Sequence, residues 1–230
     1  MDATGTYRHE LKCTIDESTY QALRRQLRCI MQPDSHVGAT GTYTIRSIYF
    51  ENYRDEALRE KLDGVQFREK FRIRWYQDDR SYITLEKKCK YNDLCQKLDA
   101  SLTQDEFARI LRGDCSWMLT HPSPLVRELY CKMHTLQLRP RVLVSYIREP
   151  YVYAPGNVRV TFDSGIRTSL FTPKLDAANI PDICATDLPG ARILEIKYDA
   201  FLPQILSDVL RGHDLRLQAF SKYGICRRFG

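Results

Sequence analysis

The chain has 230 residues, 43% hydrophobic and 28% charged, which is typical of a soluble globular protein with a sizeable core. Its formal net charge of +6, from 35 basic and 29 acidic residues, permits an anionic partner without requiring nucleic acid. No apolar run approaches the roughly 20 residues that span a bilayer, and the N-terminus has no apolar signal core. We therefore expect one cytoplasmic domain over residues 1–230.

The first half of the chain predicts strands separated by two helices. Asp16 is placed to cap a helix over residues 17–31, whose apolar stripe is Tyr20, Leu23, Leu27 and Ile30. A shorter helix follows Asn52 as its cap and ends before Gly64, and a loop is expected over residues 32–41. Alternating or β-branched patterns predict strands over residues 7–14, 42–50, 66–76, 80–90 and 93–100.

In the second half, Thr103 and Glu106 predict a capping box for a helix over residues 104–112 that ends at Gly113. Ser123 and Pro124 begin another helix. Its apolar residues are Leu125, Leu129, Met133 and Leu136. A hairpin is expected from strands 141–153 and 157–169, then a loop over 172–190, a strand over 191–199 and a helix from Pro203 to Arg211. In this last helix Ile205, Leu206, Val209 and Leu210 are expected to be buried.

About eight strands joined mostly by hairpins, with helices in clusters, favour an α+β fold. Its sheet is expected to be largely antiparallel or curled into a barrel. Charged side chains alternate along these strands. In FREKFRIRW, Lys70, Arg72 and Arg74 face away from Phe71, Ile73 and Trp75. A single strand of this kind has one wet face, which is normal. If helices cover the outside of a curled sheet, however, the charges point inward.

An interior lined with arginine and lysine is unfavourable unless it holds a polyanion, whose oxygens accept guanidinium and ammonium hydrogen bonds. A few carboxylates among the cations would then hold Mg²⁺ or Mn²⁺. The sequence has no helix-turn-helix, zinc-finger or RNA-binding aromatic signature, so nucleic acid is not expected. It also lacks a glycine-rich phosphate loop, so side chains would hold the phosphates. Eight scattered cysteines and five histidines show no zinc spacing and are interpreted as free side chains.

The ordered motifs HELK, SIYF, FRIRW, LEKK, SYIRE, VTFD, LEIKYD and FSKYG, from about residue 7 to 227, resemble the VTC domain. This domain is the polyphosphate polymerase module of the vacuolar transporter chaperone complex and belongs to the triphosphate tunnel metalloenzymes. The resemblance implies an antiparallel β-barrel that forms a tunnel and is braced by peripheral helices. It implies transfer of the γ-phosphate of ATP to a growing polyphosphate chain, with Mn²⁺ or Mg²⁺. A membrane-protein partner for the product stays open.

By the same resemblance, each matching motif contributes to a phosphate site. Arg72 and Arg74 would grip the triphosphate, and Lys87, Arg148 and Arg159 would complete the basic lining. Further phosphate contacts would come from Lys12, Tyr146, Lys197, Ser221 and Lys222. Glu195 would be a metal ligand, with Glu10 at a second carboxylate position. Strict alternation places Lys87 with Ile83 and Leu85, on the face away from the tunnel. Either the strand bulges so that Lys87 lines the tunnel, or the lining shifts to Lys88.

Two alternatives share the same fold. A hydrolase that releases phosphate from tripolyphosphate or a nucleotide would have several glutamates in its site, commonly an ExExK run in the first strand. HELK has one glutamate, Glu10, with Arg8 at the other position, which favours the polymerase. The second alternative is a protein that binds polyphosphate without turning it over.

Overall fold

The computed structural model describes residues 7–77, 79–92, 94–169, 183–185, 190, 192–217 and 220–228. Ten strands form one sheet: β1 (Arg8–Ile15), β2 (Gln32–Pro33), β3 (Tyr43–Glu51), β4 (Phe67–Tyr76), β5 (Asp79–Tyr91), β6 (Leu94–Leu102), β7 (Arg139–Tyr153), β8 (Val158–Thr168), β9 (Ile183–Cys184) and β10 (Arg192–Tyr198). The helices are α1 (Glu17–Ile30), α2 (Glu56–Leu62), α3 (Gln104–Arg112), α4 (Pro124–Thr135), α5 (Gln204–Arg211) and α6 (Lys222–Cys226), with short 3-10 turns at Ser116–Thr120 and Pro155–Asn157.

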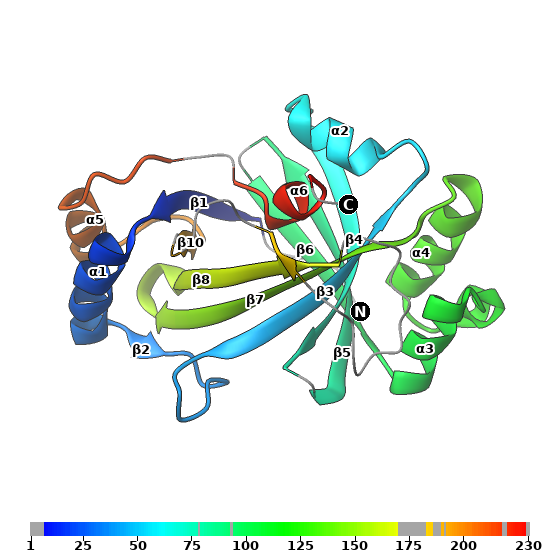
Figure 1. Ribbon diagram of the computed structural model, residues 1–230, viewed down its shortest axis with the longest axis horizontal. Helices are drawn as coiled ribbons and strands as arrows, with labels where there is room; N and C mark the ends of the chain where they lie inside the picture. Colours follow the sequence, from blue (N-terminus) through cyan, green and yellow to red (C-terminus); the bar gives the residue numbers. More distant parts are fainter. Residues whose placement is uncertain are drawn as a thin grey trace.

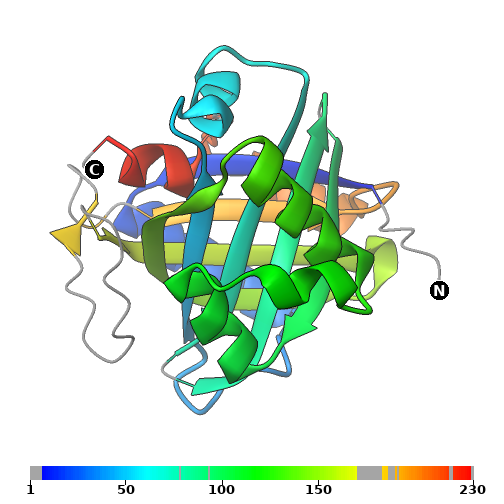
Figure 2. The same ribbon diagram turned by 90° about the vertical axis from the view of Figure 1, so that its right-hand side faces the viewer.

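Eight of the strands close into an antiparallel ring. Their order is β7-β3-β4-β5-β6-β1-β10-β8, and β8 pairs back onto β7. The seam between β1 and β6 is short, with Arg8 opposite Cys95 and His9 opposite Leu94. Strands β3 to β6 run upright in front of β1, β7, β8 and β10, which cross behind them (Figure 2). The antiparallel α+β fold with a curled sheet is thus confirmed.

Helices cover the outer, apolar faces of the ring. Helices α3 and α4 lie over the strands β3 to β6 (Figure 2), where Phe107 and Leu129 pack into one core cluster with Ile73 and Trp75. On the opposite side α1 and α5 lie next to each other (Figure 1). Their residues Tyr20, Leu23, Leu27, Leu206 and Leu210 pack on β8 and β10. Because side chains alternate along a strand, an apolar outer face leaves the charged set inside the ring.

Local sequence signals explain most of these elements. The Asp16 carboxylate accepts the Thr19 backbone N–H at the start of α1. The Thr103–Glu106 capping box starts α3, and Gly113 ends it at a φ of 81°, a conformation that favours glycine. The predicted bounds of these two helices are therefore confirmed to within one residue.

Several local expectations are wrong. Asp55, not Asn52, is the N-cap of α2, although the Asn52 side chain still accepts the backbone N–H of Glu56. Gln32–Pro33 in the first predicted loop pairs with β7 as a short strand. Ile205, which was expected to be buried, is 46% exposed because it lies on the outer side of α5. Most of the predicted loop over 172–190 lies outside the described residues, but Ile183–Cys184 pairs with β8.

Among the described residues, no helix is both long enough and apolar enough to cross a membrane.

We predict that Leu129→Ala lowers the free energy of unfolding by about 2–5 kcal/mol, because it leaves a cavity between α4 and the sheet. Leu136→Ala, at the C-terminal end of the same helix, is the matched control and should change stability by less than about 0.5 kcal/mol. Urea denaturation of the two variants measures both values. Equal destabilisation by the two substitutions would contradict the packing of α4 described above.

Candidate functional site: a cation-lined cavity

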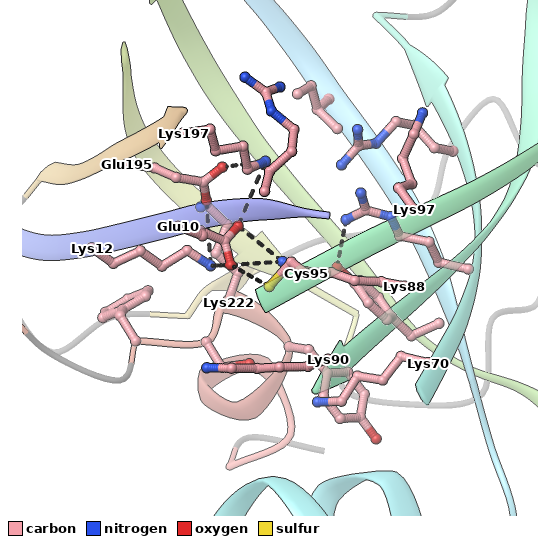
Figure 3. Close-up of a pocket in the computed structure, with 18 of the residues that line it drawn as sticks. Glu10, Lys12, Lys70, Lys88, Lys90, Cys95, Lys97, Glu195, Lys197 and Lys222 are labelled. Carbon is pink, nitrogen blue, oxygen red and sulfur yellow. Dashed lines mark hydrogen bonds and ion pairs between the residues drawn. The ribbon is translucent and has the colours of Figure 1, made fainter. Parts of the chain in front are cut away.

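The ring encloses a cavity of about 560 Å³. Fourteen lysines and arginines line it: Arg8, Lys12, Lys61, Arg68, Lys70, Arg72, Arg74, Lys88, Lys90, Lys97, Arg148, Arg159, Lys197 and Lys222. The carboxylates among the described lining residues are Glu10 and Glu195. Figure 3 shows lysines from several strands converging on these two glutamates. So large an excess of enclosed positive charge is the environment of a polyanion.

Arg72 and Arg74 of β4 are held in place by the carboxylate of Glu86 on the neighbouring strand. Glu86, on β5 directly opposite Arg72, is almost fully buried. Arg72 donates to its Oε2 from Nη2 at 2.6 Å and from Nε at 2.7 Å, and Arg74 lies 3.4 Å from its Oε1. Burial alone would raise the pKa of Glu86, but the charges of Arg72 and Arg74 outweigh it and hold that pKa well below its usual value. Glu86 therefore stays ionised and fixes both guanidinium groups.

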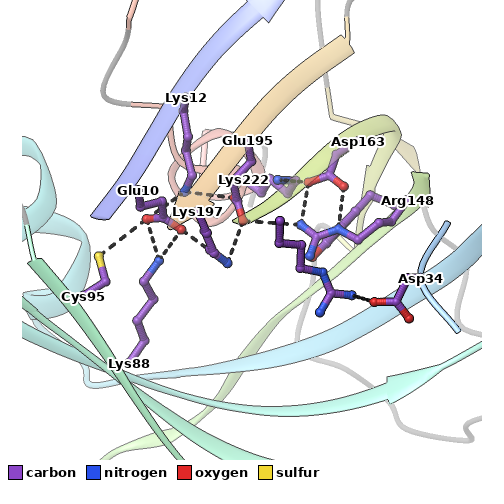
Figure 4. A network of polar contacts seen from close by, with 12 residues as sticks. Glu10, Lys12, Asp34, Lys88, Cys95, Arg148, Asp163, Glu195, Lys197 and Lys222 are labelled. Carbon is purple, nitrogen blue, oxygen red and sulfur yellow. Dashed lines mark hydrogen bonds and ion pairs between the residues drawn. The ribbon is translucent and has the colours of Figure 1, made fainter. Parts of the chain in front are cut away.

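A second buried carboxylate organises the opposite wall. Asp163 on β8 accepts two hydrogen bonds from Arg148, both of 2.7 Å, and also pairs with the Lys222 ammonium at 2.5 Å (Figure 4). Burial raises the pKa of Asp163, but Arg148 and Lys222 lower it by more. Lys222 begins α6, so Asp163 ties the C-terminal helix to the ring.

Glu10 and Glu195 share their lysine partners across β1 and β10. Lys12 lies 3.4 Å from each carboxylate, and Lys197 lies 2.7 Å from Glu195 and 3.6 Å from Glu10. Lys88 reaches Glu10 from β5 at 2.8 Å (Figure 4). Burial raises the pKa of both glutamates, but the lysines outweigh it and keep them ionised. Both are therefore negative oxygen donors inside a positive cavity.

Some hydrogen-bond donors in the cavity lack a partner in the part of the chain that the structure describes, although Arg74 pairs with Glu86 and Arg159 pairs with Asp34 at 2.7 Å. The Nε atoms of Arg74 and Arg159 are buried there without a hydrogen-bond partner. Lys70 has no carboxylate partner among the described residues and lies over the Tyr223 ring, 4.3 Å from its centroid. Burial, helped by the charge of Arg68, lowers the pKa of Lys70 to about 7. Such donors are satisfied when an anion enters.

The structure brings eleven of the twelve predicted site residues to this one cavity: Glu10, Lys12, Arg72, Arg74, Tyr146, Arg148, Arg159, Glu195, Lys197, Ser221 and Lys222. Their roles in binding or chemistry remain predictions.

The expectation that Lys87 lines the same cavity is wrong. Pairing between β4 and β5 is regular here, with Phe71 opposite Lys87 and Lys70 opposite Lys88. Lys87 therefore points to the outer face, where it pairs with Glu69 at 2.8 Å and with Glu128 of α4. Of the two alternatives left open by the sequence, the lining shifts to Lys88.

Four residues that line or support the cavity had not been assigned a site role from the sequence: Lys70, Lys88, Glu86 and Asp163. The first three lie on the same polar face of β4 and β5 as Arg72 and Arg74. The alternation of polar and apolar residues that identified the two arginines could therefore have identified them as well. Asp163 shares its face with Arg159 and Thr161, but its partner Lys222 is distant in sequence. Only the folded ring shows that these two side chains meet.

Comparison with known proteins decides the family. The model of the VTC domain matches residues 7–229. The chain belongs to the VTC domain family. A search of curated proteins found no match.

Solved structures share the fold of this VTC domain. A candidate adenylate cyclase of Bacillus halodurans is 16% identical, with a TM-score of 0.50, and the alignment covers 90% of this chain and 87% of that one. A candidate adenylyl cyclase of Hippeastrum, described as having a dominant triphosphatase activity, is 12% identical, with a TM-score of 0.55. The alignment covers 96% of this chain and 95% of that one. At these identities the likeness supports the tunnel fold alone.

We predict that Lys88→Ala weakens tripolyphosphate binding by this VTC domain about tenfold to a hundredfold. This is the change in affinity that corresponds to the free energy of one hydrogen bond to a charged group. Lys87→Ala, one residue away, should leave the affinity within about twofold because Lys87 lies outside the cavity. Isothermal titration calorimetry of both variants measures this difference. Loss of affinity in Lys87→Ala alone would contradict the assignment of the two faces.

Tripolyphosphate binding should also depend on pH through Lys70. An anion beside its ammonium raises the pKa of Lys70 above the value of about 7 in the free protein, so binding takes up a proton. The affinity should therefore fall as the pH rises through 7 toward the higher pKa of the complex. Calorimetry in buffers of different ionisation enthalpy measures the proton uptake. Lys70→Arg, which stays charged, should reduce this uptake, and an unchanged uptake would exclude Lys70 as its source.

Proposed function

We propose that this protein is an ATP-dependent polyphosphate polymerase that transfers the γ-phosphate of ATP to the end of a growing polyphosphate chain, with a divalent metal ion. The observation that carries the proposal is the cavity itself, where fourteen cationic side chains face two lining carboxylates among the described residues. Membership of the VTC domain family and the shared tunnel fold support the same class of substrate.

In the proposed reaction, a terminal phosphate oxygen of the chain attacks the γ-phosphorus. A new P–O bond forms, the bond between the γ-phosphorus and the bridging oxygen to the β-phosphate breaks, and ADP leaves with that electron pair. Phosphoryl transfer needs neutralised oxygens and aligned reactants more than a protein nucleophile. Arg72, Arg74 and Arg148 are suited to both tasks because Glu86 and Asp163 already hold their guanidinium groups in place. Lys12 and Lys197 would neutralise the chain at the opposite wall.

The cavity also fits the metal ion that tunnel enzymes use. Among the described residues, no three histidine, cysteine or acidic side chains gather closely enough to form a complete metal site. Mg²⁺ does not need one, because it commonly takes one or two carboxylates and completes its shell with phosphate oxygens and water. Glu195 and Glu10 would hold such an ion together with the substrate. The ion would supply further charge neutralisation on the phosphates.

A tunnel-fold triphosphatase is the main alternative, and the dominant triphosphatase activity described for the Hippeastrum protein shows that the fold is compatible with it. Two features favour the polymerase. Arg8 occupies the position where a second first-strand glutamate would lie, and its guanidinium pairs with Asp199 at 2.7 Å. The large excess of cations would also hold a long anionic product rather than release free phosphate quickly.

The proposal predicts that purified protein incubated with ATP and Mn²⁺ or Mg²⁺ forms polyphosphate and ADP, seen as a ladder on a polyacrylamide gel. Arg72→Ala should lower the rate at least tenfold, because it removes a guanidinium that contacts the transferring phosphates. Lys87→Ala is the matched control and should keep the rate of the unmodified protein.

The other outcomes separate the alternatives. Release of free phosphate without polymer would identify a triphosphatase. Tight tripolyphosphate binding with ATP left intact under both metals would identify a binding protein without catalysis. Either result would refute the polymerase.

A further inference from the structure

A row of tyrosine rings leads from the cavity to the protein surface. Tyr43 and Tyr76 both line the cavity, and their rings meet edge to face with centroids 5.5 Å apart. The Tyr76 ring in turn contacts that of Tyr82, with centroids 6.0 Å apart. Tyr43 is buried, whereas Tyr82 is 56% exposed. The row therefore ends in an aromatic ring that is more than half exposed.

This aromatic row adjoins the cationic wall. Arg159 donates a hydrogen bond of 3.0 Å to the Tyr43 hydroxyl, and Arg148 lies opposite Tyr43 where β3 pairs with β7. Along β4, the residues of the cavity face follow in the order Tyr76, Arg74, Arg72 and Lys70. Neighbours on one face of a strand are about 7 Å apart, so aromatic and cationic groups follow one another at a regular spacing.

One class of molecule has a flat aromatic group at one end and a chain of phosphates at the other. We propose that Tyr76 and Tyr82 form a stacking site for the base of a nucleoside triphosphate whose phosphates extend along β4 toward Arg74, Arg72 and Lys70. This proposal rests on the proposed function, because it takes a nucleoside triphosphate to be the phosphate donor. Because every base has a π-face, such stacking selects nucleotides over inorganic polyphosphate without specifying which base.

The two other exposed aromatic side chains of the β4–β5 hairpin do not compete for this role. Phe67 and Tyr91 face each other at the opposite end of the β4–β5 hairpin and are 59% and 53% exposed. By alternation along β5, however, Tyr91 lies with Lys87 on the outer face, and neither Phe67 nor Tyr91 lines the cavity. Tyr91 thus provides a control tyrosine with nearly the same exposure as Tyr82 on the same strand.

The test compares two ligands on three variants. Binding of β,γ-methylene-ATP and of tripolyphosphate, each with Mg²⁺, is measured by calorimetry for Tyr82→Ala, Tyr82→Phe and Tyr91→Ala. Loss of one stacking contact should weaken nucleotide binding by Tyr82→Ala roughly fivefold to a hundredfold. Its tripolyphosphate affinity should stay within about twofold. Tyr82→Phe, which keeps the ring, and Tyr91→Ala should bind both ligands normally.

The proposal is overturned if Tyr82→Ala binds the nucleotide normally, or if it loses affinity equally for both ligands. The circular dichroism and melting temperature of each variant show whether an equal loss comes from misfolding. If Tyr82→Ala misfolds, the nucleotide affinities of Tyr82→Phe and Tyr82→Trp are compared with that of Tyr82→Leu. A stacking site should bind the nucleotide more tightly in the two aromatic variants, and equal affinities in all three would overturn the proposal. The readout is independent of polymer formation. A nucleotide-selective loss with no polymer would therefore remove the polymerase and retain the base site.

Discussion

The excess of positive charge enclosed by the strand ring is the constraint on which the rest of the structure depends. Fourteen lysine and arginine side chains line one cavity. Like charges that are close together repel each other strongly in surroundings of low dielectric constant. Three buried carboxylates, Glu86, Asp163 and Glu195, and the partly buried Glu10 hold part of this charge in place. Removing one partner from such a buried pair leaves an uncompensated charge, which costs about 3–5 kcal/mol. These carboxylates are therefore part of the scaffold as well as of the site.

The same constraint explains why the helices lie outside. A strand that directs arginines to one face directs Phe71, Ile73 and Trp75 to the other, and that apolar face needs cover. Helices α3 and α4 supply the cover for β3 to β6, and α1 and α5 supply it for β8 and β10. Both faces of the strands are thus occupied, one by packed helices and the other by paired charge.

The sequence predicted the elements and most of the site because both depend on local alternation. Arg72, Arg74 and Glu195 reach the cavity simply by lying on the polar side of a strand. Lys87 shows the limit of motif matching, because the LEKK motif offers two adjacent lysines and only the strand register decides which one faces inward. The partnership between Asp163 and Lys222 could not be predicted, since it joins β8 to the C-terminal helix through closure of the ring. Nor does any local pattern reveal that burial lowers the pKa of Lys70.

Hydrogen-bond donors of two kinds lie in the cavity, those already used by carboxylates and those without a partner among the described residues. Arg72 and Arg148 are anchored by hydrogen bonds of 2.6–2.7 Å to buried carboxylates, so their positions are set before any ligand enters. Lys70 lacks a carboxylate partner among the described residues. The guanidinium groups of Arg74 and Arg159 are paired with Glu86 and Asp34, but their buried Nε atoms have no hydrogen-bond partner there. A phosphate that enters finds the first group already oriented, which reduces the entropy lost on binding, and it satisfies the second group. In the proposed function, the anchored guanidinium groups would thus supply geometry, and the unused donors would supply affinity.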